Sequence, residues 1–314
     1  MVHFIWASNS FGCFTGASQA SSSASRPNSY NFGRRKGSIG PVNILFDETR
    51  TELDLAPASY SRVDEERGIV LPRKITPKLA EEIGMHLGDG FLSLHRNEYR
   101  LKGSPFDERE FYQGFVAPLY KELFNLEVKL KDYGTSYGFE ACSKALWTFK
   151  SKVLKIPVGR KTGIRVPEII KVNDREVLAG FLRGYFDTDG SVSFTSRYGY
   201  PSYYPTISAA SASEFLIRDV AEILSMFGLR PTVWRNRDWW EVQLRGYNRF
   251  LRFLELIGWS SKKHVDKINA WRLRYPQLAC GASGEVVSHG PVEIKSMERP
   301  EADFDSRLAP STLI

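Results

Sequence analysis

The sequence predicts an α+β fold made of two similar units that follow one another along the chain. Two observations predict it. A segment with helical spacing ends in Asp-Gly twice, at Asp89-Gly90 and at Asp189-Gly190, 100 positions apart. Each of these segments is followed by the same order of patterns: two strand-like runs, a helical pattern, two more strand-like runs and a last helical pattern. We therefore expect one helix-strand-strand-helix-strand-strand-helix unit, present twice.

The composition narrows the class of protein. The chain has 314 residues, of which 42% are hydrophobic and 25% charged, as is typical of globular proteins. No apolar run approaches the roughly 20 residues that cross a bilayer. The three scattered cysteines are too few for a four-cysteine zinc site and odd in number for a disulfide framework. Residues 75–280 hold 31 basic and 23 acidic side chains, and this charge of +8 favours a polyanionic partner.

Both ends of the chain differ from the middle. The N-terminal part is rich in serine and proline without periodic apolar spacing, and the C-terminal part mixes Gly, Ser, Pro and acids. We expect a cytoplasmic protein, with an organelle as the alternative because no acid precedes Asp47, a bias that transit peptides share. The expected parts are a mostly disordered extension at 1–74, a first unit at 75–172, a second unit at 173–280 and a flexible tail at 281–314.

The first helix of each unit carries small residues four positions apart, such as Gly84 with Gly88 and Gly180 with Gly184. Because this spacing puts them on one face, we expect the two helices to pack closely against each other. Thr76, and Asn173 or Asp174, are the expected N-caps. The helices are expected at about 77–88, 107–124, 174–188 and 213–227, and the strands at about 91–94, 98–102, 127–132, 137–142, 192–196, 206–210, 231–235 and 239–245.

Asp89 and Asp189 each stand at the C-terminal end of a predicted helix, where the helix dipole disfavours a negative charge. If the two helices pack side by side, the two carboxylates meet. They would then repel each other unless they shared a proton or bound a divalent metal. Oxygen ligands with few nitrogen or sulfur neighbours favour magnesium over zinc.

The run LRGYFDTDG at 182–190 resembles the LAGLIDADG motif, and EIGMHLGDG at 82–90 keeps its glycines and its final Asp-Gly. Over about residues 75–275 the chain is similar to single-chain LAGLIDADG homing endonucleases, which carry two such motifs. The resemblance implies two pseudo-symmetric αββαββα units, with packed motif helices and saddle-shaped antiparallel sheets that lie on DNA.

The resemblance also implies roles for particular residues. In this family the last acid of each motif binds the divalent metals that cut the two DNA strands, which assigns catalysis and Mg²⁺ binding to Asp89 and Asp189. Gly88 and Thr188, which precede them, are assigned to the same metal sites. Lys161 in the first unit and Lys262 or Lys263 in the second are implied to stabilise the phosphate charge, of which we select Lys161 and Lys263 as catalytic. The alternative is that these lysines belong to solvated basic loops.

Two departures from the family pattern stand out. The first acid of the motif is Asp187 in the second copy but Leu87 in the first, which we expect to matter little. Many members carry a lysine or glutamine just after the second strand of each unit. Here these places read GSP at 103–105 and ASA at 210–212, so we expect slow cleavage.

The residues that contact DNA can be predicted from strand alternation. A strand on the major groove sends every second side chain to the bases, where arginine suits guanine and asparagine or glutamine suits adenine. The candidates are Arg96, Asn97, Arg100 and Lys102 in the first unit, and Arg197, Tyr198, Arg235, Arg237, Gln243 and Arg245 in the second.

The function expected from the sequence is that of a site-specific homing endonuclease for double-stranded DNA, intron-encoded and monomeric. It would hydrolyse phosphodiester bonds with Mg²⁺ at a long, pseudo-symmetric target. One alternative is a nucleic-acid-binding protein on the same fold that does not cut, such as a maturase of its host intron RNA or a regulator. Another is an interaction protein in which the repeated Asp-Gly is coincidence. An intein is not expected, because the chain neither begins with Cys or Ser nor ends in His-Asn.

Overall fold

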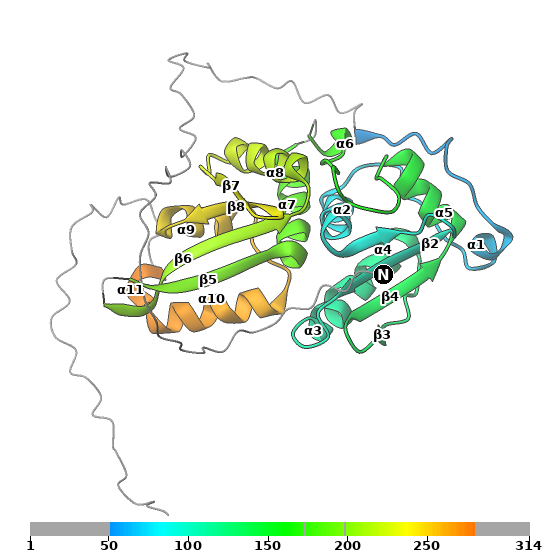
Figure 1. Ribbon diagram of the computed structural model, residues 1–314. Coiled ribbons are helices and arrows are strands. Elements are labelled where there is room, and N and C mark those ends of the chain that lie inside the picture. Colours follow the sequence, from blue (N-terminus) through cyan, green and yellow to red (C-terminus); the bar gives the residue numbers. More distant parts are fainter. Residues whose placement is uncertain (1–50, 172–173, 198, 280–314) are drawn as a thin grey trace, which may run out of the picture. The chain divides into compact units, whose positions relative to one another are not determined.

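The computed structural model describes residues 51–171, 174–197 and 199–279 (Figure 1). The expectations for residues 1–50, for the tail at 281–314 and for Tyr198 lie outside these residues. We call residues 75–171 the first half and residues 174–279 the second half. In the described part of the chain no helix is long and apolar enough to cross a membrane.

The first half contains the predicted order of helices and strands. A short helix, α1 (Arg62–Glu66), precedes it. Its elements are α2 (Pro77–Asp89), β1 (Gly90–Leu92), β2 (Glu98–Gly103), α3 (Arg109–Phe111), the π-helical turn η2 (Tyr112–Val116), α4 (Ala117–Phe124), β3 (Lys131–Asp132), β4 (Tyr137–Cys142), α5 (Lys144–Thr148), the π-helical turn η3 (Phe149–Val153) and α6 (Glu168–Lys171).

The second half repeats this order with longer strands. Its elements are α7 (Arg175–Asp189), β5 (Gly190–Arg197), β6 (Tyr200–Ser211), α8 (Glu214–Met226), β7 (Thr232–Asn236), β8 (Trp239–Arg245), α9 (Tyr247–Leu256), α10 (Lys262–Arg274) and α11 (Pro276–Ala279). The α+β class and the repeated unit predicted from the sequence are thereby confirmed.

Each half builds one antiparallel sheet of four strands with the same topology (Figure 1). The strand order is β1-β2-β4-β3 in the first half and β5-β6-β8-β7 in the second. In both halves the motif helix leads directly into the outer strand, so Gly90 pairs with Leu101 and Gly190 pairs with Ala209. The end of β2 therefore returns to the C-terminal end of α2, and the end of β6 returns to that of α7.

The motif helices begin where their side chains can cap them. The hydroxyl of Thr76 accepts a hydrogen bond from the amide of Leu79 at 3.2 Å, and Pro77 occupies the first helical position, where its missing N–H costs nothing. Asp174 caps α7 by accepting from the amide of Val177 at 2.9 Å. The predicted caps Thr76 and Asp174 are confirmed.

The predicted boundary at residue 74 needs correction, because residues 51–74 pack against the first half. The buried carboxylate of Asp64 accepts hydrogen bonds from Ser61 and, at 3.1 Å, from the amide of Ala145. Ile69 and Leu71 are buried in the core. The sequence pattern does not reveal this packing, because the segment makes its contacts through irregular chain and through one five-residue helix that has no apolar periodicity.

The core of the first half contains a buried polar network. Lys150 and Glu82 form an ion pair whose side chains are both 0% exposed. The hydroxyl of Tyr120 donates to Glu82 and lies 2.8 Å from the hydroxyl of Tyr99, whose ring stacks on His86 with centroids 5.2 Å apart. We call these five residues the polar core.

Candidate active site

The two motif helices pack through main-chain atoms along the predicted strip of small residues. A Cβ atom on Gly84 would overlap the carbonyl oxygen of Phe181 and lie 2.6 Å from the amide nitrogen of Tyr185. One on Gly184 would overlap the carbonyl oxygen of Glu81. No side chain can stand between helices that approach so closely, which is the physical reason for glycine at these positions. The packing brings the C-terminal ends of both helices to one place.

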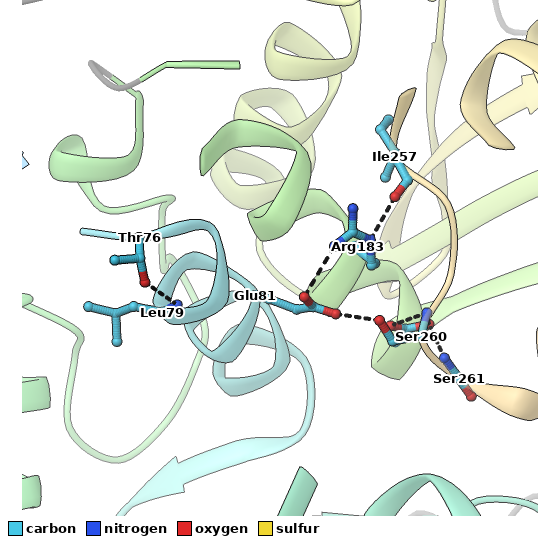
Figure 2. Close-up of polar contacts among 8 residues, drawn as sticks. Thr76, Leu79, Glu81, Arg183, Ile257, Ser260 and Ser261 are labelled. Carbon is cyan, nitrogen blue, oxygen red and sulfur yellow. Dashed lines mark hydrogen bonds and ion pairs between the residues drawn. The ribbon is translucent and has the colours of Figure 1, made fainter. Parts of the chain in front are cut away.

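Polar side chains beside this contact tie the two halves together, as Figure 2 shows. The guanidinium of Arg183 donates to Glu81 at 3.2 Å and to the carbonyl oxygen of Ile257 at 2.7 Å. The hydroxyl of Ser260 donates to the other oxygen of Glu81 at 2.6 Å. Burial raises the pKa of Glu81, although the hydrogen bond from Ser260 and the charge of Arg183 oppose the rise. The loop before α10 is thereby attached to α2.

Asp89 and Asp189 meet at the ends of the packed helices, as the sequence predicts. The carboxyl carbon of Asp189 lies 3.4 Å from the point where a Cβ on Gly88 would stand. Burial, followed by the negative charge of Asp189, raises the pKa of Asp89 well above its usual value. Burial also raises the pKa of Asp189, to about 6, with Glu108 adding to the rise and Lys161 opposing it. Two carboxylates that repel each other in a partly buried place favour binding of a cation.

Glu108 is a third carboxylate of the site, which the sequence reasoning missed. It is buried just before α3, and its Oε2 accepts from the amide of Ser104 at 2.6 Å. A Cβ on Gly103 would overlap Glu108 and lie 3.1 Å from an oxygen of Asp89, so both carboxylates face the end of β2. A single glutamate at the start of a helix is normally a solvated residue that interacts favourably with the helix dipole. Local pattern therefore gave no sign of its role.

Lys161 lies at the C-terminal end of α2. Its ammonium donates to the carbonyl oxygens of His86 at 3.0 Å, Leu87 at 3.2 Å and Gly88. The carbonyl oxygen of His86 also accepts from the amide of Gly90, whereas a helix end leaves its last carbonyls without helical partners. A cation at this end also suits the helix dipole. Burial lowers the pKa of Lys161, while the charges of Asp189 and Asp89 oppose this change. The structure thus places Lys161 beside both predicted catalytic carboxylates.

The structure separates the two candidate lysines of the second half. Lys263 enters the site, where it forms an ion pair with Glu108. Lys262 lies outside it and pairs with Glu110 at 2.7 Å, with both side chains exposed. Lys263 is therefore the second-half lysine that geometry supports, and its charge also acts on both Asp89 and Asp189.

Asp187, the first acid of the second motif, has a structural task that the sequence did not indicate. Its buried carboxylate accepts from the amide of Ser260 at 3.1 Å and from the amide of Ser261 at 2.9 Å. These amides belong to the two residues just before α10, so Asp187 fixes the loop that leads into the helix carrying Lys263. Burial raises its pKa to about 8. The first half has Leu87 at the corresponding position, and its lysine lies in a loop instead.

The oxygen donors fit a hard divalent cation in part. Asp89 and Asp189 offer carboxylate oxygens without nitrogen or sulfur ligands. The hydroxyl of Tyr112 is buried without a partner among the described residues, and burial, followed by the charges of Asp89 and Glu108, raises its pKa. The predicted ligand Gly88 already accepts a hydrogen bond from Lys161, and the described chain holds no cluster of three or more acidic, histidine or cysteine side chains arranged for a metal. The donor set is thus the two carboxylates of Asp89 and Asp189.

The predicted DNA-contacting residues of the first half lie on or beside one face of its sheet, opposite the core. The register places Arg100, Lys102 and Glu140 on this face. Acids already neutralise its cations: Lys102 lies 2.6 Å from Glu140, and Arg100 pairs with Glu98 and, at 3.4 Å, with Glu140. Arg96 and Asn97 are exposed in the turn between β1 and β2.

The corresponding face of the second sheet is different in chemistry. Its strands present hydroxyl and amide groups with few charges. The register places Ser191, Ser193, Thr195, Thr206, Ser208, Thr232, Gln243 and Arg245 on this face. Gln243 accepts from Arg245 at 2.7 Å and donates to Glu241 at 2.6 Å.

Arg235, which was predicted to contact DNA together with Gln243 and Arg245, does not lie on their face of the sheet. It pairs with Trp240 across the ladder, and its guanidinium lies 6.0 Å from the centre of that ring. Strand alternation therefore puts it on the opposite face of the sheet. The prediction was based on the position of Arg235 near the hairpin and did not take the alternation of side chains along the strand into account. Arg237 lies in the hairpin turn with a φ of 48°, and Arg197 stacks on Tyr204 at the end of β5.

Residues 176–258 match the model of the LAGLIDADG-like domain. The matched segment contains most of α7, the whole second sheet and helices α8 and α9. The second half therefore matches the LAGLIDADG-like domain, and the resemblance predicted from the motifs is confirmed. The first half repeats the same element order and strand order within the same chain.

Curated relatives share only a segment with this chain. Glutamine–fructose-6-phosphate aminotransferase (isomerizing) of Methanocaldococcus jannaschii is 28% identical over 64% of this chain and 18% of its own length. The probable translation initiation factor IF-2 of Thermococcus kodakarensis is 30% identical over 48% of this chain and 13% of its own length. The replication factor C small subunit of Methanocaldococcus jannaschii is 25% identical over 61% and 10%. The chain thus spans less than a fifth of the length of each of these relatives.

Solved structures with a similar fold include the homing endonuclease I-DmoI in complex with DNA and Mn. It is 16% identical over 59% of this chain and 98% of that one, with a TM-score of 0.42. The N-terminal LAGLIDADG domain of DUF199/WhiA is 17% identical over 63% of this chain and 90% of that one, with a TM-score of 0.39. At these values the site has to be understood from its own residues.

Proposed function

We propose that this protein is a site-specific endonuclease for double-stranded DNA of the homing type, intron-encoded and dependent on Mg²⁺. One observation carries the proposal: Asp89 and Asp189 meet at the ends of two packed helices, with Lys161 and Lys263 beside them. Two carboxylates and two lysines on one chain suffice for one cut in each strand. We therefore also propose a monomer, acting in the cytoplasm or in an organelle.

The residues of the site have distinct tasks in this proposal. Asp89 and Asp189 hold the divalent cations, which supply Lewis-acid charge and a more acidic water when bound. The ammonium of Lys161, fixed by the carbonyl oxygens at the end of α2, stabilises negative charge on the phosphate in the transition state. Because those carbonyls hold the ammonium in place beforehand, little reorganisation is needed when the charge develops.

The polar faces of the two sheets are the proposed DNA surface. The second sheet offers Gln243 and Arg245 together with a row of hydroxyl groups, which suit base edges and phosphates. The first sheet offers Arg100 and Lys102. Because the two faces differ in chemistry, the proposed target is pseudo-symmetric rather than palindromic.

A non-cleaving nucleic-acid-binding protein, such as a maturase for host intron RNA or a regulator, is the second candidate. The pairing of Lys263 with Glu108 favours it, because one of the two site lysines is already neutralised. Lys102 and Arg100 are likewise paired with acids. Such a protein would bind nucleic acid without needing either site carboxylate.

The deciding experiment is cleavage of a randomised duplex library by the full chain with Mg²⁺, followed by sequencing of the cut ends. On the target so found, Asp89→Asn and Asp189→Asn should each abolish cutting of both strands, while binding stays within a few-fold. Asp238→Asn, an exposed aspartate in the hairpin turn, is the matched control and should cut normally. Full activity in either site variant would contradict the two-carboxylate mechanism, and binding without any cutting would favour the second candidate.

A further inference from the structure

Two ion pairs connect the segment around α3 in the first half with the first turn of α10 in the second. Glu108 pairs with Lys263, and these side chains are 4% and 16% exposed. Glu110 pairs with Lys262, and these are 68% and 60% exposed. The two pairs join the same elements and differ in depth. The outer pair is therefore a natural control for the inner one.

Both partners of the inner pair are held in place by other contacts. The second oxygen of Glu108 accepts from the amide of Ser104 at 2.6 Å. Lys263 lies in the first turn of α10, and Asp187 binds the amides of Ser260 and Ser261 just before this helix. An ion pair with fixed, nearly buried partners keeps more of its attraction than an exposed pair, which water and salt screen.

Lys161, the corresponding lysine of the first half, has no such partner. Its ammonium is bound by neutral carbonyl oxygens, and no carboxylate lies within ion-pair distance of it among the described residues. A phosphate that approaches Lys161 therefore displaces no anion. A phosphate that approaches Lys263 competes with Glu108.

We propose that Glu108 masks Lys263, so that the two strands of the duplex are cut at unequal rates and a nicked duplex accumulates. Glu108 is thus a residue that sets the order of strand cleavage and belongs to the half opposite the lysine it controls. This inference rests on the proposed nuclease function for its kinetic consequence. The masking itself does not depend on it.

The kinetic test uses a supercoiled plasmid with one target, from which the first cut gives a nicked circle and the second a linear product. For the wild-type chain the second rate constant should be clearly smaller than the first. Glu108→Gln keeps the size and the hydrogen-bonding oxygen but removes the charge. It should raise the second rate constant on the order of tenfold, which is less than the roughly hundredfold effect of removing an electrostatic group outright, because masking weakens Lys263 without removing it. Glu110→Gln should leave both unchanged.

The masking is measured separately by the rate at which acetic anhydride modifies each lysine of the folded full chain. The modified lysines are identified by mass spectrometry of the peptides after digestion. Lys263 should react slowly in the wild type and several-fold faster in Glu108→Gln, whereas Lys161 should not change. In Glu110→Gln only Lys262 should become more reactive. This readout decides the masking even if no duplex is cut, in which case the proposed function fails by itself.

Two results would overturn the inference. Unchanged reactivity of Lys263 in folded Glu108→Gln would show that the pair does not mask it. Loss of both cuts in that variant would show that Glu108 is part of the catalytic machinery rather than a mask. If Glu108→Gln does not fold, single lysine substitutions in the otherwise wild-type chain still test the masking. There Lys161→Gln should slow the faster cut more than Lys263→Gln slows the slower one, and the reverse order would contradict masking.

Discussion

The residues buried behind α2 and behind α7 occupy corresponding positions, but those behind α2 are polar and those behind α7 are apolar. In the first half the polar core of Glu82, His86, Tyr99, Tyr120 and Lys150 is buried behind α2. Corresponding positions of the two halves lie 100 residues apart in the motif helices and 103 residues apart in the later helices, and the strand register relates the strands. These relations give the positions behind α7 that match the polar core. These are Leu182, Phe186, Ile207, Ile223 and Phe253, all buried and apolar. One backbone arrangement thus accepts either interior.

This difference teaches that the polar core is not required by the fold. Burying an ion pair costs desolvation that its attraction need not recover, and apolar residues of similar size often stabilise as well or better. The cost is visible in the atoms left over: Glu82 Oε2 and His86 Nδ1 are buried without hydrogen-bond partners among the described residues. Burial and the charge of Lys150 also hold the pKa of His86 well below its usual value. We therefore expect the first half to be the more sensitive to single substitutions.

The largest effect is expected from breaking the buried ion pair. Lys150→Met should destabilise the chain by about 3 to 5 kcal/mol, because Glu82 would remain as an unpaired buried charge. The double variant Glu82→Leu with Lys150→Met, which imitates the second half, should recover most of this loss. Urea denaturation of the full chain measures both. Lys152→Met, at an exposed position of the same turn, is the control and should change stability little. A double variant no more stable than the single one would show that the polar core is irreplaceable.

A second prediction concerns a buried ionisable group of the second half that lies outside its apolar interior behind α7. His264 is buried against the ring of Trp259, and neither of its ring nitrogens has a hydrogen-bond partner among the described residues. Burial, followed by the charges of Lys263 and Lys267, lowers its pKa to about 3, and the charge of Asp107 opposes this change. The unfolded chain takes up this proton first, at a pKa of about 6.5. Stability should therefore fall as the pH falls below 6.5, by about 2 kcal/mol at pH 5.

The comparison that isolates this effect is His264→Phe. Unfolding of the two chains is followed between pH 7 and pH 5, and the wild type should lose about 2 kcal/mol relative to the variant over this range. Above pH 7 the two curves should run parallel. Parallel curves down to pH 5 would mean that His264 does not contribute to acid lability.

The smallest effect is expected at the surface, where the two sheet faces differ. Glu140→Gln frees Lys102 in the first half, so the slope of log affinity against log salt should steepen by roughly one. Glu241→Gln is the matched change in the second half, where the partner is the neutral amide of Gln243, and its slope should stay as in the wild type. Binding to the best duplex found, measured over a salt series, tests both. Equal slopes would remove the proposed role of Lys102.

The sequence predicted the two motif helices to within about two residues at each end, because capping residues, glycine spacing and the final Asp-Gly are all local signals. It also predicted the meeting of Asp89 and Asp189, since the repeat itself requires that equivalent positions face each other across the helix contact. The first two strands of the second half were predicted too short, as β6 runs from Tyr200 to Ser211 through a segment in which tyrosines and prolines obscure the alternation.

Other parts of the site could not be predicted in this way. Glu108 and Lys263 lie 155 positions apart, and neither residue differs locally from a solvated charge. The binding of the loop before α10 by Asp187 likewise depends on how the chain at Ser260 returns to α7. The polar core contains Lys150 and Glu82, residue types that composition rules place on the surface. Such contacts are properties of the folded chain rather than of any window of sequence.

The contact between the motif helices has a consequence for how such a protein can diversify. Where Gly84 and Gly184 meet the opposite main chain, every other residue type adds atoms to a space that is already filled. The open sheet faces carry no such constraint, since their side chains project away from the core. Variants with new surface specificity can therefore arise by exchange of strand residues alone, while the joint that aligns Asp89 with Asp189 is inherited unchanged.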